Sequence, residues 1–337
     1  MSASTASARD KARTPKFLLS AENELRRVEE VLSWELASNV ETVRAASSHI
    51  LEAGGKRLRP TLVILSAKSW PGEYNVDRLV NIAAVTELIH MATLMHDDVI
   101  DGAERRRGRT TANTFWGNQI SVLTGDYMLA KAFSILACDA DAKIMQALSR
   151  ATVAMTEGEI SQIESRGDTR SVTPYYLSTI RDKTAAFMSA CCRVGAILAS
   201  AMTDAENSLA GYGLNLGLAF QITDDLLDLV GDPGQTGKPI GGDIREGKAT
   251  MPVILALERS SSVEKTKIER ILAGHDVTSG NVEFVRKTAE ETGAIEATRE
   301  TAAGYVKRAT EDVRGIPRSP ARQALEDLAE YILQRER

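Results

Sequence analysis

The sequence has few cysteines and no uninterrupted apolar run as long as a membrane span. The cysteines among its 337 residues are Cys138 and the adjacent pair Cys191 and Cys192. This spacing suits neither a zinc site nor a disulfide between neighbours, so we expect reduced and mostly buried thiols. No apolar run reaches about 18 residues, and the N-terminus lacks the apolar core of a secretory signal. These absences predict a cytoplasmic protein without a transmembrane segment.

An excess of basic charge is also absent. The chain has 41 Lys and Arg against 46 Asp and Glu, a formal net charge of −5, which excludes nucleic acid as the main partner because no broad basic surface is available. Strand patterns are nearly absent too, whereas apolar residues recur at helical spacing from Phe17 onward. The sequence predicts one all-α domain over residues 17–337, preceded by a flexible tail over residues 1–16.

Two groups of aspartates share the pattern Asp-Asp-x-x-Asp: Asp97, Asp98 and Asp101, and then Asp224, Asp225 and Asp228. On a helix, this spacing places three carboxylates on one face, where like charges repel by roughly 0.2–0.5 kcal/mol per pair. A single group could be a solvated helix end, but two at the ends of long apolar patterns indicate a shared ligand. Carboxylates and phosphate oxygens together suit Mg²⁺, so we expect several Mg²⁺ ions bridging to a diphosphate.

Basic and polar side chains near these aspartates could bind the rest of such a ligand. The basic candidates are Lys56 and Arg59 in "GGKRLRP", Arg106 and Arg107, Lys183, and Lys238 and Lys248. The other candidates are His90, two helical turns before Asp97, Thr184 next to Lys183, and Gln221, which shares a helix face with Asp224. The alternatives to ligand binding are that the loop cations are simply exposed to solvent and that His90 is an ordinary core residue.

These segments together resemble the all-trans polyprenyl diphosphate synthases, or polyprenyl synthetases. The resemblance runs through "GGKRLRP", "IHMATLMHDDVIDGAERRRG", "GD" at Gly125 and Asp126, "DKTA", "GLAFQITDDLLD" and "GKPIGGDIREGKATMP". It implies a single large all-α bundle around a deep central cavity, usually as a homodimer. It also implies head-to-tail condensation of isopentenyl diphosphate with an allylic diphosphate such as farnesyl or geranylgeranyl diphosphate. The apolar product would be released through transient membrane contact.

By motif matching, the resemblance also implies roles for individual residues. The principal Mg²⁺ ligands would be Asp97, Asp101 and Asp224, and those ligating directly or through water would be Asp98, Asp225 and Asp228. The allylic diphosphate would be bound by Arg106, Lys183, Lys238 and Lys248. Isopentenyl diphosphate would be bound by Lys56, Arg59, His90 and Arg107. Oxygens of Thr184 and Gln221 would stabilise the allylic cation, and the departed diphosphate would accept the proton.

The resemblance also implies that product length would depend on residues about one turn before Asp97. Short-chain members of this family commonly carry bulky aromatic residues four and five positions before the first aspartate, where this chain has Thr93 and Ala92. We therefore expect an open path and a product of heptaprenyl to decaprenyl size, with Met128 and Phe133 as candidates for a deeper floor. The alternatives are a short-chain farnesyl or geranylgeranyl diphosphate synthase, a class I terpene cyclase, and a non-catalytic synthase subunit.

Overall fold

The computed structural model describes residues 15–106, 108–167, 173–231, 240–275 and 277–334, and these are almost entirely helical. In this part of the chain the only sheet is a two-stranded antiparallel hairpin that pairs Arg105 with Thr110. The predicted all-α class is confirmed. The predicted N-terminal tail lies largely in residues 1–14, outside the described residues, and helix α2 begins at Lys16.

The chain divides into two compact units. Unit 1 comprises Met1–Met145, Cys191–Leu209 and Val313–Leu328, and unit 2 comprises Gln146–Ala190, Ala210–Asp312 and Ala329–Arg337. Four helices contribute residues to both units: α8 (Ala142–Glu164), α10 (Ala186–Leu198), α11 (Thr203–Val230) and α18 (Pro320–Gln334). The single domain predicted over residues 17–337 stays a prediction.

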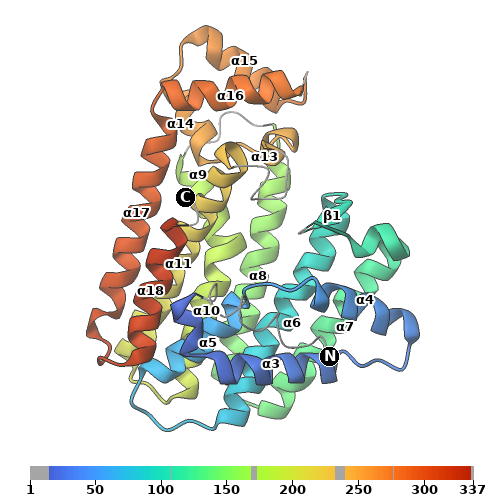
Figure 1. The fold of residues 1–337 in the computed structure, drawn as a ribbon, viewed down its shortest axis with the longest axis vertical. Coiled ribbons are helices and arrows are strands. Elements are labelled where there is room, and N and C mark those ends of the chain that lie inside the picture. Colours follow the sequence, from blue (N-terminus) through green and yellow to red (C-terminus); the bar gives the residue numbers. More distant parts are fainter. Residues whose placement is uncertain (1–14, 107, 168–172, 232–239, 276, 335–337) are drawn as a thin grey trace, which may run out of the picture. The chain divides into compact units, whose positions relative to one another are not determined.

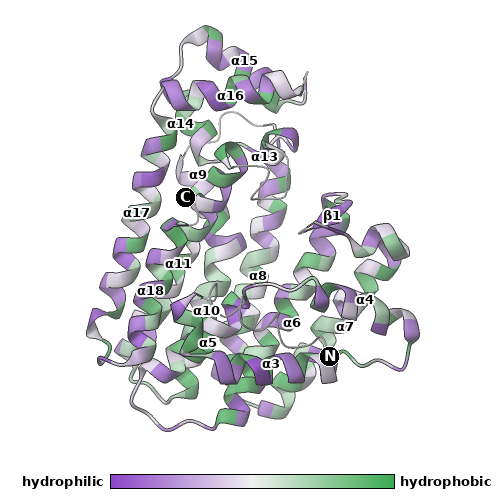
Figure 2. Ribbon diagram, viewed as in Figure 1, coloured by the Kyte–Doolittle hydropathy of each residue, from purple (hydrophilic) through white to green (hydrophobic). Residues whose placement is uncertain are grey.

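The elements that belong to unit 1 alone are α2 (Lys16–Leu19), α3 (Glu22–Glu35), α4 (Glu41–Glu52), α5 (Leu58–Ser69), α6 (Val76–Ile100), β1 (Arg105–Arg106), β2 (Arg109–Thr110), α7 (Ala112–Asp139) and the 3₁₀ turn η2 (Val313–Gly315). Helix α6 packs along α7 and contacts α3 and α5 (Figure 1). It begins after Asn75, whose side chain accepts a hydrogen bond from the Arg78 backbone N–H at 3.0 Å. The apolar residues of α6 surround its axis, because neighbouring helices cover it on several sides. In Figure 2, α3 is largely hydrophilic and α5 is largely hydrophobic.

Two helices of unit 1, α6 and α7, are long and apolar enough to cross a membrane by length and composition alone. The sequence analysis predicted no such segment because it considered only uninterrupted apolar runs. Both helices contain a few charged residues but are apolar on average over 18 residues. The most apolar window of α6 is 72% buried, as in the core helix of a soluble protein, while that of α7 is only 33% buried. Helix α7 therefore presents an apolar surface that unit 1 does not cover.

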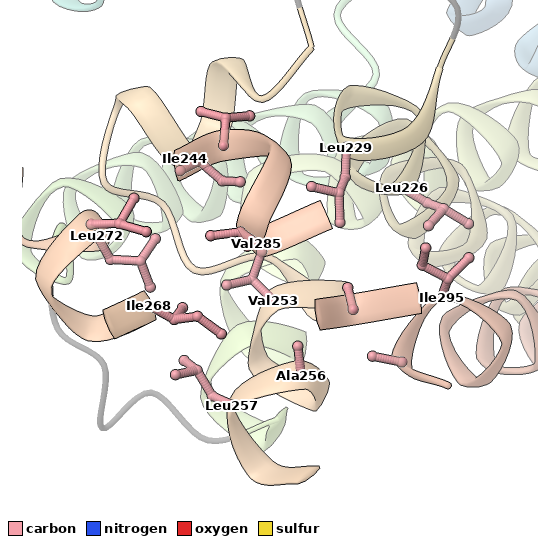
Figure 3. Close-up of a cluster of buried hydrophobic side chains, with 14 residues drawn as sticks. Leu226, Leu229, Ile244, Val253, Ala256, Leu257, Ile268, Leu272, Val285 and Ile295 are labelled. Carbon is pink, nitrogen blue, oxygen red and sulfur yellow. The ribbon is translucent and has the colours of Figure 1, made fainter. Parts of the chain in front are cut away.

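Unit 2 alone contains α9 (Thr173–Ile180), the π-helix η1 (Arg181–Ala185), α13 (Gly242–Arg245), α14 (Met251–Arg259), α15 (Ser262–Leu272), α16 (Ser279–Glu291) and α17 (Ala294–Asp312). A hydrophobic cluster joins the C-terminal end of α11 to α13, α14, α15 and α16 (Figure 3). Leu226 and Leu229 of α11 contribute to it, together with Ile244, Val253 and Val285. Since these leucines lie beside Asp225 and Asp228 in sequence, the cluster fixes the helix end that carries the second group of aspartates.

The cysteines follow the expectation with one exception. All three are free thiols; Cys191 and Cys192 are buried, but Cys138 near the end of α7 is exposed. Burial raises the pKa of Cys192 to about 12, so this thiol stays protonated and unreactive near neutral pH.

Candidate active site

The first group of aspartates lies at the C-terminal end of α6 in unit 1. Asp97 and Asp98 belong to the last turn, and Asp101 is the C-cap residue. The C-terminal end of a helix carries partial negative charge, so carboxylates there are disfavoured, each by about 0.3–1 kcal/mol. Three of them at this end oppose both the helix dipole and one another. Such an arrangement favours a cationic ligand.

Asp98 is buried and pairs with a basic residue of the hairpin. Its Oδ1 accepts a hydrogen bond from Arg106 Nε at 2.7 Å, and its backbone carbonyl accepts one from Asn113 Nδ2 at 3.1 Å. The structure thus brings together two residues that were predicted to bind metal and diphosphate, respectively. In this arrangement Arg106 offsets part of the negative charge at the end of α6.

Gly125 of the "GD" motif makes room for the residue that precedes Asp97. A Cβ at this position would lie 2.3 Å from His96 Nε2, well inside van der Waals contact. The same nitrogen lies 3.2 Å from the Val122 carbonyl oxygen and 3.3 Å from Asp126 Oδ1. The absence of a side chain at Gly125 therefore lets α7 approach α6 at the turn that carries the first aspartates.

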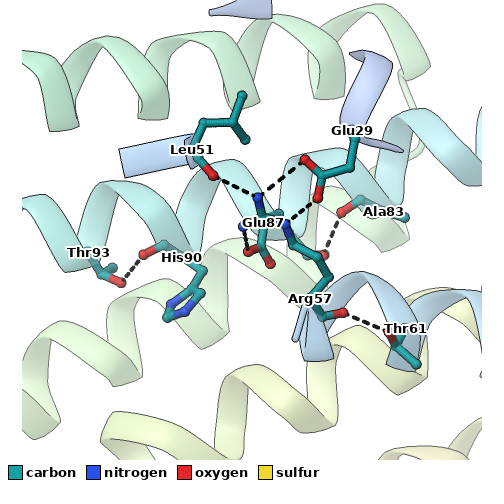
Figure 4. Close-up of polar contacts among 9 residues, drawn as sticks. Glu29, Leu51, Arg57, Thr61, Ala83, Glu87, His90 and Thr93 are labelled. Carbon is teal, nitrogen blue, oxygen red and sulfur yellow. Dashed lines mark hydrogen bonds and ion pairs between the residues drawn. The ribbon is translucent and has the colours of Figure 1, made fainter. Parts of the chain in front are cut away.

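The "GGKRLRP" segment is fixed by Arg57, which sequence reasoning left without a role. Arg57 donates to Glu29 Oε1 at 2.5 Å, to Glu87 Oε1 at 2.9 Å and to the Leu51 carbonyl at 3.2 Å (Figure 4). Burial opposes the charge of Arg57, but its hydrogen bonds to Glu29 and the attraction of Glu87 raise its pKa above the ordinary value. The left-handed backbone at this residue, with φ of 47°, is held by these contacts.

Around this anchored arginine, the predicted isopentenyl diphosphate residues take different positions in unit 1. Lys56 is exposed in the loop, whereas Arg59 in the first turn of α5 and His90 of α6 are partly buried. The His90 carbonyl accepts a hydrogen bond from Thr93 Oγ1 at 2.8 Å (Figure 4). Arg107 lies outside the described residues.

The predicted chain-length residues also lie on α6. Ala92 is fully buried and Thr93 is partly buried, and both are as small as the open-path hypothesis requires. Of the two candidates for a floor, Met128 is fully buried, but the Phe133 side chain is 55% exposed and so does not lie in the interior of unit 1. Phe133 is therefore a poor candidate for a floor within this unit.

The second group of aspartates lies in the last two turns of α11 in unit 2. Asp224 is exposed, Asp228 is partly buried and Asp225 is buried. Asp225 Oδ2 accepts a hydrogen bond from Tyr176 Oη at 2.6 Å, and its Oδ1 accepts one from Gln221 Nε2 at 2.7 Å. Both oxygens of Asp225 thus have neutral donors. Its carboxylate lies in a polar network, while Asp224 reaches solvent.

A further carboxylate, Asp243, accompanies this group. Its backbone N–H donates to Asp228 Oδ2 at 2.9 Å. Burial and the adjacent carboxylates raise the pKa of Asp225 to about 7, and burial with Asp225 and Asp228 raises the pKa of Asp243 well above its ordinary value. Burial is the main cause of both shifts and the neighbouring carboxylates add to it, so a cation at this end of α11 would offset crowded negative charge.

Lys183 and Thr184 lie in the π-helix η1. Lys183 Nζ forms an ion pair with Glu159 of α8 and donates to Gln162 Oε1 at 2.7 Å. Thr184 Oγ1 donates to Gln221 Oε1 at 2.8 Å. π-Helical turns are rare and are found frequently at functional sites, so the π-helical backbone of η1 supports a functional role for this segment.

Two glycines allow neighbouring helices to contact η1 closely. A Cβ on Gly158 of α8 would lie 2.6 Å from the Lys183 backbone nitrogen, and one on Gly217 of α11 would lie 2.5 Å from Ala185 Cα. In both cases the obstacle is backbone, which cannot turn aside as a side chain can. The position of Lys183 and Thr184 therefore depends on the absence of these two side chains.

The remaining predicted residues follow α11. Lys248 is partly buried, its Nζ lies 2.5 Å from Glu246 Oε2, and its backbone N–H donates to the Asp243 carbonyl at 2.8 Å. Lys238 lies outside the described residues. Among the described residues, no group of three or more His, Cys, Asp and Glu side chains is arranged to hold a metal ion.

Sequence reasoning missed several residues that support this chemistry: Arg57, Gly158, Glu159, Tyr176, Gly217 and Asp243. Asp243 could have been found, because it lies within the quoted segment "GKPIGGDIREGKATMP". Tyr176 and Gly158 carry no local signal, since their partners lie on other helices.

The helical fold and the repeated aspartate motif define a class of prenyl-transferring enzymes, and comparison with known proteins identifies the family. The polyprenyl synthetase family model matches residues 40–289, and the chain belongs to this family. It is similar to heptaprenyl diphosphate synthase component 2 of Geobacillus stearothermophilus, with 37% identity over 93% of this chain and 96% of that protein. It is also similar to octaprenyl diphosphate synthase of Escherichia coli (strain K12), with 35% identity over 90% of this chain and 93% of that protein.

The structure is similar to that of a polyprenyl synthase from Caulobacter crescentus CB15 in complex with calcium and isoprenyl diphosphate. The TM-score is 0.91 and the identity is 36%, over 96% of this chain and 98% of that one. These comparisons confirm the predicted family, the isoprenoid synthase fold and the assignment as a prenyl-transferring enzyme.

Proposed function

We propose that this chain condenses isopentenyl diphosphate with an allylic diphosphate, head to tail, to form a medium- or long-chain all-trans polyprenyl diphosphate. The observation that carries the proposal is the pair of matching carboxylate groups at the C-terminal ends of α6 and α11, the first of them paired with Arg106. Family membership and the heptaprenyl and octaprenyl synthases among the relatives support the same reaction.

The described carboxylates are not arranged as a ready-made metal site, but their chemistry suits divalent cations, and we assign Mg²⁺ to them. Their donors are all oxygens, they crowd negative charge at the negative ends of helix dipoles, and a related structure contains calcium. Asp97, Asp101 and Asp224 would be the main ligands. Asp98, Asp225 and Asp228 would assist, directly or through water. Bound Mg²⁺ would neutralise charge on the departing diphosphate.

The basic residues bind the two diphosphates in this proposal. Arg106, Lys183, Lys238 and Lys248 hold the allylic diphosphate, and Lys56, Arg59, His90 and Arg107 hold isopentenyl diphosphate. The ion pairs of Arg106 with Asp98 and of Lys183 with Glu159 keep these cations in place before substrate binds. A diphosphate then offers each cation more negative charge than the single carboxylate does.

Ionisation of the allylic C–O bond leaves a carbocation, which the isopentenyl double bond attacks before a proton is lost. Oxygen lone pairs of Thr184 and Gln221 stabilise this cation electrostatically, and the departed diphosphate accepts the proton. No side chain is required as a covalent nucleophile.

The small side chains of Ala92 and Thr93 support a long product, because the α6 helix lacks aromatic bulk there. A short-chain farnesyl or geranylgeranyl diphosphate synthase is the alternative. The intact second aspartate motif argues against a class I terpene cyclase. The intact set of acidic and basic residues argues against a non-catalytic subunit.

The exposed apolar surface of α7 supports self-association, and we propose a homodimer. Val122, Leu123 and Phe133 are 38%, 61% and 55% exposed, and Val122 and Phe133 lie on one helix face because they are 11 residues apart. One relative is named component 2 of its synthase, so a different partner subunit is the alternative. Sedimentation of wild type and Phe133→Lys would test this: we expect a dimeric wild type and a weaker dimer in Phe133→Lys, and a monomeric wild type would contradict it. We also propose a cytoplasmic location.

The test of the reaction is diphosphate release by the purified protein with Mg²⁺, isopentenyl diphosphate and farnesyl diphosphate. We expect release only when both substrates are present, and Asp224→Asn, which keeps side-chain size, should lower turnover by roughly 100-fold or more because it removes one charge at the reacting diphosphate. A cyclase would release diphosphate without isopentenyl diphosphate, and a non-catalytic subunit would release none.

A further inference from the structure

Tyr176 begins a hydrogen-bonded chain of side chains within unit 2. Its phenol donates to Asp225 Oδ2 at 2.6 Å, and Asp225 Oδ1 accepts from Gln221 Nε2 at 2.7 Å. Gln221 Oε1 in turn accepts from Thr184 Oγ1 at 2.8 Å. Three elements, α9, α11 and η1, are joined by this chain.

The direction of the chain follows from the chemistry of its members. Both Asp225 oxygens accept hydrogen bonds, as an ionised carboxylate does, so Gln221 turns its amino group toward Asp225 and its carbonyl toward Thr184. Thr184 has a single O–H, and the Gln221 carbonyl receives it. The oxygen of Thr184 therefore keeps only lone pairs for a ligand. Such a site suits a cation and repels an anion.

Tyr176 is the member that holds the carboxylate from the other side. It is buried, with 6% of its surface exposed, and it occupies Asp225 Oδ2. Without this donor, the carboxylate could rotate away from Gln221, and the Gln221 amide would lose the partner that fixes its donor and acceptor ends.

We propose that Tyr176 is a positioning residue for prenyl transfer, which acts through Asp225 and Gln221 to present the oxygen lone pairs of Thr184 to the allylic cation. This inference rests on the proposed function, because it assigns the cation of that reaction to this site. Tyr176 itself does not contact the reacting atoms in this account.

The adjacent Tyr175 provides a matched control. Its phenol contacts Ser161 of α8, 2.7 Å from Oγ and 3.0 Å from the carbonyl oxygen, and it is not part of the chain. Tyr176→Phe should lower kcat about 10- to 100-fold, the range for one hydrogen bond to a charged group, while KM for both substrates changes less than about twofold. Tyr175→Phe should keep kcat within about twofold. Equal kcat values for the two variants would overturn the proposal.

A double-mutant cycle separates positioning from a structural role. Gln221→Met removes the amide that passes the effect to Thr184, so adding Tyr176→Phe to it should change kcat by less than about twofold. If the two substitutions instead lowered kcat by independent factors, so that the double variant lost the product of both, Tyr176 would act by another route and the inference would be refuted.

A proton NMR measurement tests the chain without turnover. The Tyr176 hydroxyl proton, identified by its loss in Tyr176→Phe, should shift in Gln221→Met and in Thr184→Val, because each interrupts the chain. A resonance unchanged in both variants would overturn the inference. Absence of condensation by the wild type would instead refute the proposed function, while this measurement would still decide whether the chain exists.

Discussion

Replacing Gly158 by Ala should displace the segment that carries Lys183 and Thr184. The new Cβ would lie 2.6 Å from the Lys183 backbone nitrogen, whereas ordinary van der Waals contact begins at 3.4 Å. The backbone of α8 or η1 must therefore move by 0.8 Å. Overpacking of this kind costs about 1–3 kcal/mol, and helix propensity returns about 0.5–1 kcal/mol. We expect the free energy of unfolding to fall by roughly 1 kcal/mol. Because misplacement by about 1 Å can cost roughly 100-fold, turnover should fall about 10- to 100-fold.

Gly304 in α17 is the matched control for this substitution, since a Cβ there meets nothing within 4 Å. Gly304→Ala should raise the free energy of unfolding by about 0.5–1 kcal/mol and leave turnover unchanged. Urea unfolding and diphosphate release, measured on both variants, provide the comparison. If Gly158→Ala were stabilised like Gly304→Ala and kept full turnover, the close approach to η1 would have no importance.

Three further predictions concern substrate binding, stability and product length. Lys56→Ala should chiefly raise KM for isopentenyl diphosphate and Lys183→Ala should chiefly impair use of the allylic substrate, whereas equal effects on both substrates would refute the division. Arg57→Met removes the partner of the buried Glu87 carboxylate and should lower the free energy of unfolding by about 3 kcal/mol. Arg78→Met, at a more exposed ion pair, should lower it by about 1 kcal/mol or less. Similar losses for the two variants in urea unfolding would contradict this prediction. Ala92→Phe should shorten the product seen by chromatography, and an unchanged length would exclude a path beside Ala92.

The helical fold could be predicted because apolar periodicity is strong along the chain. The repeated aspartate motif indicated a ligand, since its cost to a helix needs compensation. Exposure of Cys138 and the apolar windows of α6 and α7 were missed, because counting uninterrupted runs does not show which helix face neighbours cover.

Contacts between distant residues could not be predicted. Tyr176 and Asp225 are 49 residues apart in sequence, and Arg57 and Glu87 are 30 apart, so only folding shows that they pair. Gly158 likewise reads as an ordinary helical position until η1 is placed beside it. The sequence thus predicted which charged side chains bind a ligand, which stays a prediction, but it did not predict the residues that hold those side chains in place.

The length of the wild-type product tests the central proposal most directly. Purified protein would be incubated with Mg²⁺, farnesyl diphosphate and an excess of labelled isopentenyl diphosphate, and the dephosphorylated products separated by chromatography against polyprenol standards. We predict all-trans products of heptaprenyl size or longer. Products that stop at geranylgeranyl size, or no elongation of the allylic primer at all, would contradict the proposal of a medium- or long-chain polyprenyl diphosphate synthase.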